Sequence, residues 1–134
     1  MVLFSPGLDL TYSRPGIEEI FDPVLDLAAL RQSGIDWAGG ATEASVDDLA
    51  VTDPLVSPLY GSLEGLPPTY VYTGSMEYSA VNALALQDKA LATPGSDFTF
   101  ILRKGQIHDW ALATPITLDG LLVQPQVYRQ LLGD

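Results

Sequence analysis

Three short apolar segments, each followed by proline, glycine or a charged pair, restrict the fold of this sequence more than any other feature. They cover residues 2–5, 69–73 and 98–102. Near-continuous apolar runs of this length are typical of strands that are covered on both faces. Stretches with helical periodicity separate and follow them, which indicates a parallel sheet with flanking helices. The sequence therefore predicts an α/β fold with about three parallel strands.

Three helices are predicted. The first begins at Asp22, a common N-cap residue followed by proline, and ends at Gly34. The others cover residues 79–92 and roughly 118–132, where Pro125 either kinks the last helix or marks its true start. The side chains expected to face the core are Val81, Leu84 and Leu91 in one helix, and Leu121, Leu122, Tyr128, Leu131 and Leu132 in the other.

Residues 34–68 show little periodicity, although they are numerous for a plain connection. Long segments of this kind are usually functional, and we interpret this one as a lid or pocket wall. Trp37 and Phe21 fit either a pocket wall or the core. The acidic pair Asp47–Asp48 is interpreted as part of a solvated loop.

Composition excludes several classes of function. Hydrophobic residues make up 47% of the 134 residues and charged ones 17%, which is typical of one packed domain or a piece of one. A net charge of −11 argues against nucleic acid or an anionic membrane surface as a partner. With no cysteine and one histidine, neither a metal nor another cofactor is expected. No apolar run approaches the ~18 residues of a membrane span, and the start lacks the basic lead of a secretion signal, so we expect a cytoplasmic protein.

The only histidine, His108, follows the third predicted strand. Open α/β sheets bind ligands at the carboxyl ends of their strands, and an imidazole can take and return a proton at neutral pH. Glu77 follows the second strand, where a neighbouring strand about 4.8 Å away would bring it within reach of His108. That geometry is typical of an acid that orients a general base, but Glu77 could equally stabilise the start of the next helix. Asp109 is a poorer partner because adjacent side chains diverge.

Four pieces of the sequence resemble a known family. They are SPGLDLT at 5–11, DPVLD at 22–26, DPLVSPLYGSLEGLPPTYVYTGSMEYSAVNA at 53–83 and LRKGQIHDW at 102–110. They are similar to the C-terminal half of α/β-hydrolases of the hormone-sensitive-lipase-like carboxylesterase and lipase family. The resemblance implies that residues 1–134 form a partial α/β-hydrolase domain. It also implies that Glu77 and His108 are the acid and base of a Ser–His–Glu triad that hydrolyses a small-molecule carboxylic ester.

Two motifs of such enzymes do not occur in this sequence. They are the G-x-S-x-G nucleophile turn and the glycine-rich oxyanion loop. Residues 61–65 have the wrong order, and Ser75 belongs to the turn that carries the acid. The family has both motifs upstream of the segment that matches residues 2–5. We therefore expect the nucleophile-bearing N-terminal half to be absent and this chain to be inactive by itself.

Three interpretations follow from the missing motifs. The chain is part of an ester hydrolase, a non-catalytic remnant or interaction module, or a complementing half that needs a separately encoded N-terminal half. In the family the strand at 2–5 has neighbours on both sides, and proteins avoid exposing an unpaired edge. We therefore expect the chain to self-associate or to bind the missing half.

Overall fold

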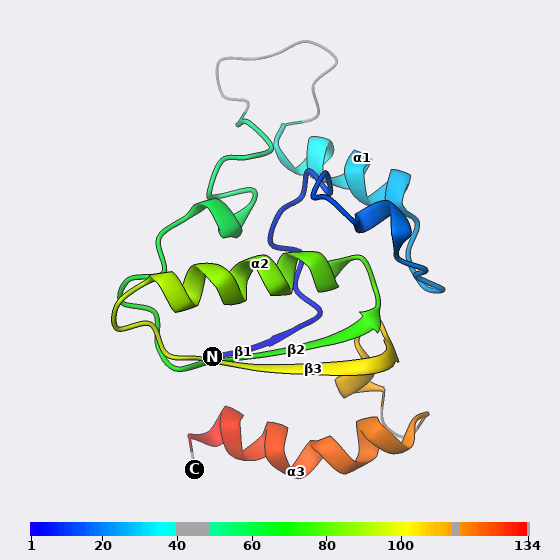
Figure 1. The fold of residues 1–134 in the computed structure, drawn as a ribbon, viewed down its shortest axis with the longest axis vertical. Helices are drawn as coiled ribbons and strands as arrows, with labels where there is room; N and C mark the ends of the chain where they lie inside the picture. The colour runs from blue at the N-terminus through cyan, green and yellow to red at the C-terminus, as the bar shows by residue number, and fades with distance from the viewer. Residues whose placement is uncertain (40–48, 114–115, 134) are drawn as a thin grey trace.

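The computed structural model describes residues 1–39, 49–113 and 116–133. Its sheet contains the strands β1 (Val2–Phe4), β2 (Thr69–Met76) and β3 (Phe98–Ile107), all parallel and in the order β1-β2-β3. The helices α1 (Leu27–Trp37) and α2 (Ser79–Ala92) lie on one side of this sheet, and α3 (Leu118–Leu132) lies on the other (Figure 1). The predicted α/β fold is confirmed. Short 3-10 helices cover Ile17–Glu19, Pro58–Tyr60 and Trp110–Leu112.

The central strand β2 is buried on both faces, as its apolar sequence predicts. Successive side chains of a strand point to opposite faces. Val71 accordingly packs in a cluster with Ala83 and Leu86 of α2, while Tyr72 packs with Trp110 and residues of α3. Both residues are almost inaccessible to solvent. In the register of β2 with β1 and β3, apolar residues lie beside apolar residues. The sheet therefore separates two apolar layers.

The strands β2 and β3 extend beyond their predicted ends. The predicted strands end at residues 73 and 102, before Gly74 and the charged pair Arg103–Lys104, but β2 continues to Met76 and β3 to Ile107. The register shifts between Gly74 and Met76, as in a β-bulge, and Gly105 adopts a φ of 77°. Glycine within a strand commonly marks such a bulge, so these glycines bend the ladder without ending it.

The first helix lies about one turn later than predicted. Its N-cap is Asp26, whose side chain accepts a hydrogen bond from the amide of Ala29 at 2.8 Å. Asp22 stabilises a turn before the helix, because its Oδ1 accepts from the amides of Val24 and Leu25. Gly34 is not the end of α1 but a buried position inside it. At this position α1 lies against the backbone of the loop at Leu10. Helix propensity alone does not reveal this contact.

The predicted inward face of α3 is wrong, and that of α2 is wrong in part, since Val81 is partly buried against a core cluster. The buried positions of α2 are Ser79, Asn82, Ala83, Leu86 and Ala90, whereas Leu84 and Leu91 are exposed. In α3 the buried positions are Gly120, Val123 and Val127, and the leucines and tyrosine expected in the core are all exposed. Small side chains let both helices approach the sheet closely, so the larger apolar residues lie outside the contact.

The long irregular segment is partly a wall of the core. Val56, Leu59 and Leu63 are buried, and residues 54–66 line one side of an apolar cavity of about 380 Å³ beside β1. Trp37 and Phe21 are 72% and 70% exposed, so neither is a core residue. The pair Asp47–Asp48 lies outside the described residues. None of the helices in the described ranges has the length and apolar character needed to cross a bilayer.

We expect Gly34→Ala to destabilise the protein. Alanine in place of glycine inside a helix normally stabilises it by about 1 kcal/mol. Here the added Cβ would lie 2.3 Å from the carbonyl oxygen of Leu10, so α1 would have to move away from this loop. Overpacking of this kind costs about 1–3 kcal/mol. Urea denaturation measures the difference, with the exposed Ser33→Ala in the same helix as control, and a Gly34→Ala variant more stable than wild type would contradict the contact.

Candidate active site

Glu77 lies in the turn between β2 and α2, and its side chain is completely buried. Its Oε1 accepts hydrogen bonds from the hydroxyls of Ser5 at 3.0 Å and Thr73 at 2.6 Å, and from the amide of Gly74. Its Oε2 accepts one from the hydroxyl of Ser79 at 2.6 Å. A buried carboxylate is tolerated only when such donors replace water.

His108 directly follows β3, and it completes this set of contacts. Its Nδ1 lies 3.0 Å from Glu77 Oε2, so the pairing of these two residues expected from the strand ends is confirmed. Because the carboxylate only accepts, His108 carries its proton on Nδ1 when neutral. The other nitrogen, Nε2, is then free to accept a proton. The imidazole is 24% exposed, in contrast to the completely buried side chain of Glu77.

Asp109 contacts the opposite side of the imidazole. Its Oδ2 lies 3.6 Å from His108 Nε2, beyond hydrogen-bond range but close enough for electrostatic attraction to a protonated ring. The prediction that Asp109 is the poorer partner is confirmed, since Glu77 makes the hydrogen bond to Nδ1. Asp109 is 45% exposed at its side chain, in contrast to the buried Glu77.

Glu77 does not serve as the N-cap of α2. The N-cap residue of this helix is Tyr78, which makes no side-chain cap hydrogen bond, and the amide of Tyr78 donates to Asp22 Oδ2 at 3.1 Å. Asp22 therefore ties the segment before α1 to the start of α2. The carboxylate of Glu77 instead accepts hydrogen bonds from residues at the strand ends and from the hydroxyl of Ser79, the first residue of α2.

Gly74 allows the acid and the histidine to come together. A Cβ at this position would lie 2.1 Å from the carbonyl oxygen of Gln106, so only glycine permits this approach of β2 to β3. Ser75 Oγ accepts from the amide of Gly105 at 2.8 Å, and the side chain of Gln106 donates to Asp119 of α3 at 2.6 Å. The segment before His108 is thus held by β2 on one side and by α3 on the other.

Trp110 anchors the segment after His108. Its ring is buried against Tyr72 with a centroid distance of 6.1 Å, and the guanidinium of Arg103 lies 5.9 Å from the ring. Burial raises the pKa of Tyr72, and its hydroxyl donates to Gln130 of α3 at 2.5 Å. These contacts hold Trp110 in the apolar layer between the sheet and α3.

Sequence reasoning missed the hydroxyl groups around Glu77. Thr73 and Ser79 lie within four residues of it, so the local segment Thr-Gly-Ser-Met-Glu-Tyr-Ser could have suggested them. Ser5 lies 72 residues away, and only the pairing of β1 with β2 brings it close. The resemblance included Ser5 in one matching piece without assigning it a role.

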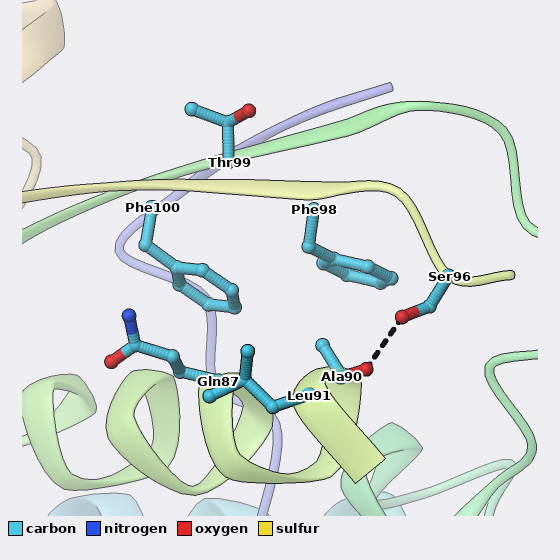
Figure 2. Close-up of a pocket in the computed structure, with 7 residues that line it drawn as sticks. All are labelled: Gln87, Ala90, Leu91, Ser96, Phe98, Thr99 and Phe100. Atoms are coloured by element: carbon cyan, nitrogen blue, oxygen red, sulfur yellow. Dashed lines mark hydrogen bonds between the residues drawn. The ribbon is translucent and has the colours of Figure 1, made fainter. Parts of the chain in front are cut away.

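A second open groove on the sheet is a poor candidate for a functional site. It has a volume of about 360 Å³ and lies between the end of α2 and the start of β3, where Phe98 and Phe100 stack (Figure 2). Open α/β sheets bind their ligands at the carboxyl ends of the strands, and this groove lies at the amino end of β3. It contains no titratable side chain among its lining residues.

A parallel sheet with an acid after one strand and a histidine after the next defines the second half of an α/β-hydrolase. The comparison with known families agrees: a model described as the alpha/beta hydrolase fold matches residues 1–112, and this chain belongs to that family. The predicted resemblance to esterases and lipases is likewise confirmed by the curated relatives, and structures of the hormone-sensitive-lipase type share the fold.

Two curated relatives are similar to most of the chain. A triacylglycerol lipase of Mycobacterium tuberculosis (strain ATCC 25618 / H37Rv) is 47% identical over 117 residues, which cover 87% of this chain and 24% of the lipase. An esterase of Acinetobacter venetianus is 35% identical over 92 residues, covering 67% of this chain and 28% of the esterase. The chain therefore spans about a quarter of the length of the curated relatives it matches.

Solved structures agree on the fold. A hormone-sensitive lipase from a metagenome library superposes with a TM-score of 0.78 at 22% identity, covering 95% of this chain and 42% of that one. An esterase/lipase from an uncultured bacterium superposes with a TM-score of 0.77 at 23% identity, covering 94% and 40%. At these identities the agreement concerns the fold alone.

We expect Gly74→Ala to separate Glu77 from His108. The new methyl group would collide with the backbone at Gln106, and the ends of β2 and β3 would have to part. The cost in stability should be about 1–3 kcal/mol. The ring nitrogens of His108 report the pairing by NMR, because it is the only histidine.

Gly61→Ala is the matched control for this change. A Cβ at Gly61 would meet its nearest neighbours at 3.3 and 3.4 Å, contacts that small shifts can relieve. Unchanged ring signals in Gly74→Ala, at wild-type stability, would contradict the role given to this glycine.

Proposed function

We propose that residues 1–134 are the C-terminal part of the catalytic domain of a serine carboxylic-ester hydrolase. Glu77 is its acid and His108 its base, in a Ser–His–Glu triad whose nucleophile comes from outside these residues. The observation that carries the proposal is the 3.0 Å contact between His108 Nδ1 and the buried carboxylate of Glu77, at the carboxyl edge of a parallel sheet. Membership of a family with esterase and lipase relatives supports it.

The geometry suits a general base. Glu77 orients the imidazole through Nδ1 and stabilises the imidazolium that forms when Nε2 takes a proton. In ester hydrolysis that proton comes from the nucleophilic serine, and the imidazolium then returns it to the leaving alcohol. The donors around Glu77 keep the carboxylate in place during both steps.

The nucleophile is the part this chain does not supply. The sequence contains no G-x-S-x-G motif, and no described serine hydroxyl forms a hydrogen bond with His108. Without a nucleophile and the donors of an oxyanion hole, the base has no serine to activate and the tetrahedral intermediate is not stabilised. We therefore propose that the chain is inactive alone and that the complete enzyme acts on a small-molecule carboxylic ester.

The chain should complement the missing half of a relative. Purified alone, it is expected to show no turnover of p-nitrophenyl butyrate above the buffer rate. The part of the Mycobacterium tuberculosis lipase that lies outside its match to this chain provides a partner, given 47% identity in the matched part. Coexpression of the two should restore turnover, and His108→Ala or Glu77→Gln should lower kcat by at least about 10³-fold.

Glu64→Gln is the matched control, because Glu64 is an exposed acid in a loop. A His108-dependent rate for the chain alone would show that one of its own serines acts as nucleophile. A stable but inactive complex of the two halves would favour the non-catalytic remnant. A reading frame directly upstream of Met1 that contains G-x-S-x-G would favour a complementing half encoded separately.

We also propose that the chain associates through surfaces that have no partner here. In the described part of the sheet, β1 pairs with β2 on one side only, and α3 exposes Leu121, Leu122, Leu131 and Leu132. Unpaired edges and apolar patches of this kind favour pairing with another chain. The partner is a second copy or the missing half. The cytoplasmic location remains a prediction.

Sedimentation should therefore give a mass above the monomer at micromolar concentration. Replacing Leu122 and Leu132 by glutamate should lower that mass, because the exposed apolar face of α3 would gain two charges. The same replacement at the exposed Val24, in the segment before α1, serves as control. A compact monomer in which the amides of β1 are protected from exchange would contradict the proposal.

A further inference from the structure

Ser5 connects the acid of the candidate site with the loop that carries the base. It lies directly after β1 and is 5% exposed. Its hydroxyl donates to Glu77 Oε1 at 3.0 Å and accepts from the amide of Asp109 at 2.9 Å. Since Asp109 is the residue after His108, one oxygen atom joins both halves of the Glu77–His108 pair. The two contacts span 72 and 104 residues of sequence.

The backbone is held in an uncommon conformation at both ends of this second hydrogen bond. Ser5 has a φ of 39° and Asp109 a φ of 57°, in the left-handed region that residues other than glycine seldom adopt. Such conformations persist where surrounding contacts enforce them, and they cluster at functional sites. At Ser5 the amide donates to the carbonyl of Tyr72 at 2.8 Å, which fixes the turn that aims the hydroxyl at Glu77.

The other hydroxyl donors to Glu77 cannot do the same. Thr73 and Ser79 lie four and two residues from Glu77, so their hydrogen bonds order the acid turn itself. Ser75 holds the histidine segment on its other side, through the amide of Gly105. Ser5 alone among the described hydroxyl groups touches both the acid and the residue that follows the histidine.

We propose that Ser5 is a positioning residue that holds His108 against Glu77. It makes no contact with a reacting atom and acts through the Asp109 amide, which sets the path of the chain on leaving His108. Its relevance to ester hydrolysis rests on the function proposed above. The link itself is a property of this chain and can be measured without any activity.

Ser5→Gly and Ser5→Ala test the link in the full chain. Both remove the hydroxyl, and glycine also accepts the positive φ without strain, so the glycine variant separates loss of the hydroxyl from backbone damage. Thr73→Val is the matched control, since it removes another donor to the same carboxylate oxygen but none to Asp109. Histidine labelled with ¹⁵N gives one set of ring signals, because His108 is the only histidine.

Ser5→Gly should accelerate amide exchange at Asp109 by about tenfold, the effect of losing one hydrogen bond. It should also shift or broaden the Nδ1 proton signal of His108 while the overall amide spectrum remains dispersed. Thr73→Val should leave the exchange rate at Asp109 unchanged. A merely structural contribution of Ser5 would lower stability without moving the histidine signal.

Two results would overturn the proposal. One is a wild-type His108 signal in Ser5→Gly, whatever the change in stability or in amide exchange at Asp109. The other is loss of the fold in both Ser5 variants while Thr73→Val stays folded, since Ser5 would then be needed for folding in general. Neither result depends on hydrolysis, so failure of this proposal is distinguishable from failure of complementation.

Discussion

The carboxylate of Glu77 is the constraint around which this structure is organised. A fully buried charge has lost its water and must find its donors within the protein, or the protein loses several kcal/mol of stability. Here the donors come from the end of β1, the end of β2, the start of α2 and the segment after β3. These elements have to meet at one point for the charge to be tolerated. The arrangement that satisfies the carboxylate also brings the imidazole to it.

Close backbone approach is what makes this meeting possible. Gly74 has no side chain where β2 passes Gln106, and the small residues of α2 let the helix settle onto Val71. On the opposite face, Tyr72 and Trp110 fill the space between the sheet and α3. Around the site, small residues therefore set how closely the backbone segments approach, and large aromatic residues fill the space between the sheet and α3.

The same packing explains which features sequence reasoning found and which it missed. Apolar strands and helical periodicity are local signals, so the element order, α2 and the parallel sheet were predictable. Gly34 and Gly74 were interpreted as ends of elements, but each lies inside one. A glycine that ends an element and a glycine that lets another chain segment approach look alike in sequence. The inward face of α3 and part of that of α2 were wrong for a related reason, because the contacts depend on how close each helix comes to the sheet.

The sequence by itself determined the fold class and placed Glu77 and His108 after neighbouring strands, whose ends must lie close together. Spacing left the role of Glu77 open, and the resemblance to a known family suggested the pair. The sequence could not determine the role of Ser5, the position of Asp109 beside Nε2 or the exposure of the leucines on α3. Those features depend on contacts between residues far apart in the chain, and short-range patterns of hydrophobicity carry no information about them. Only the tertiary structure brings a hydroxyl from β1 to an amide 104 residues later, because the order of strands in the sheet decides which ends meet.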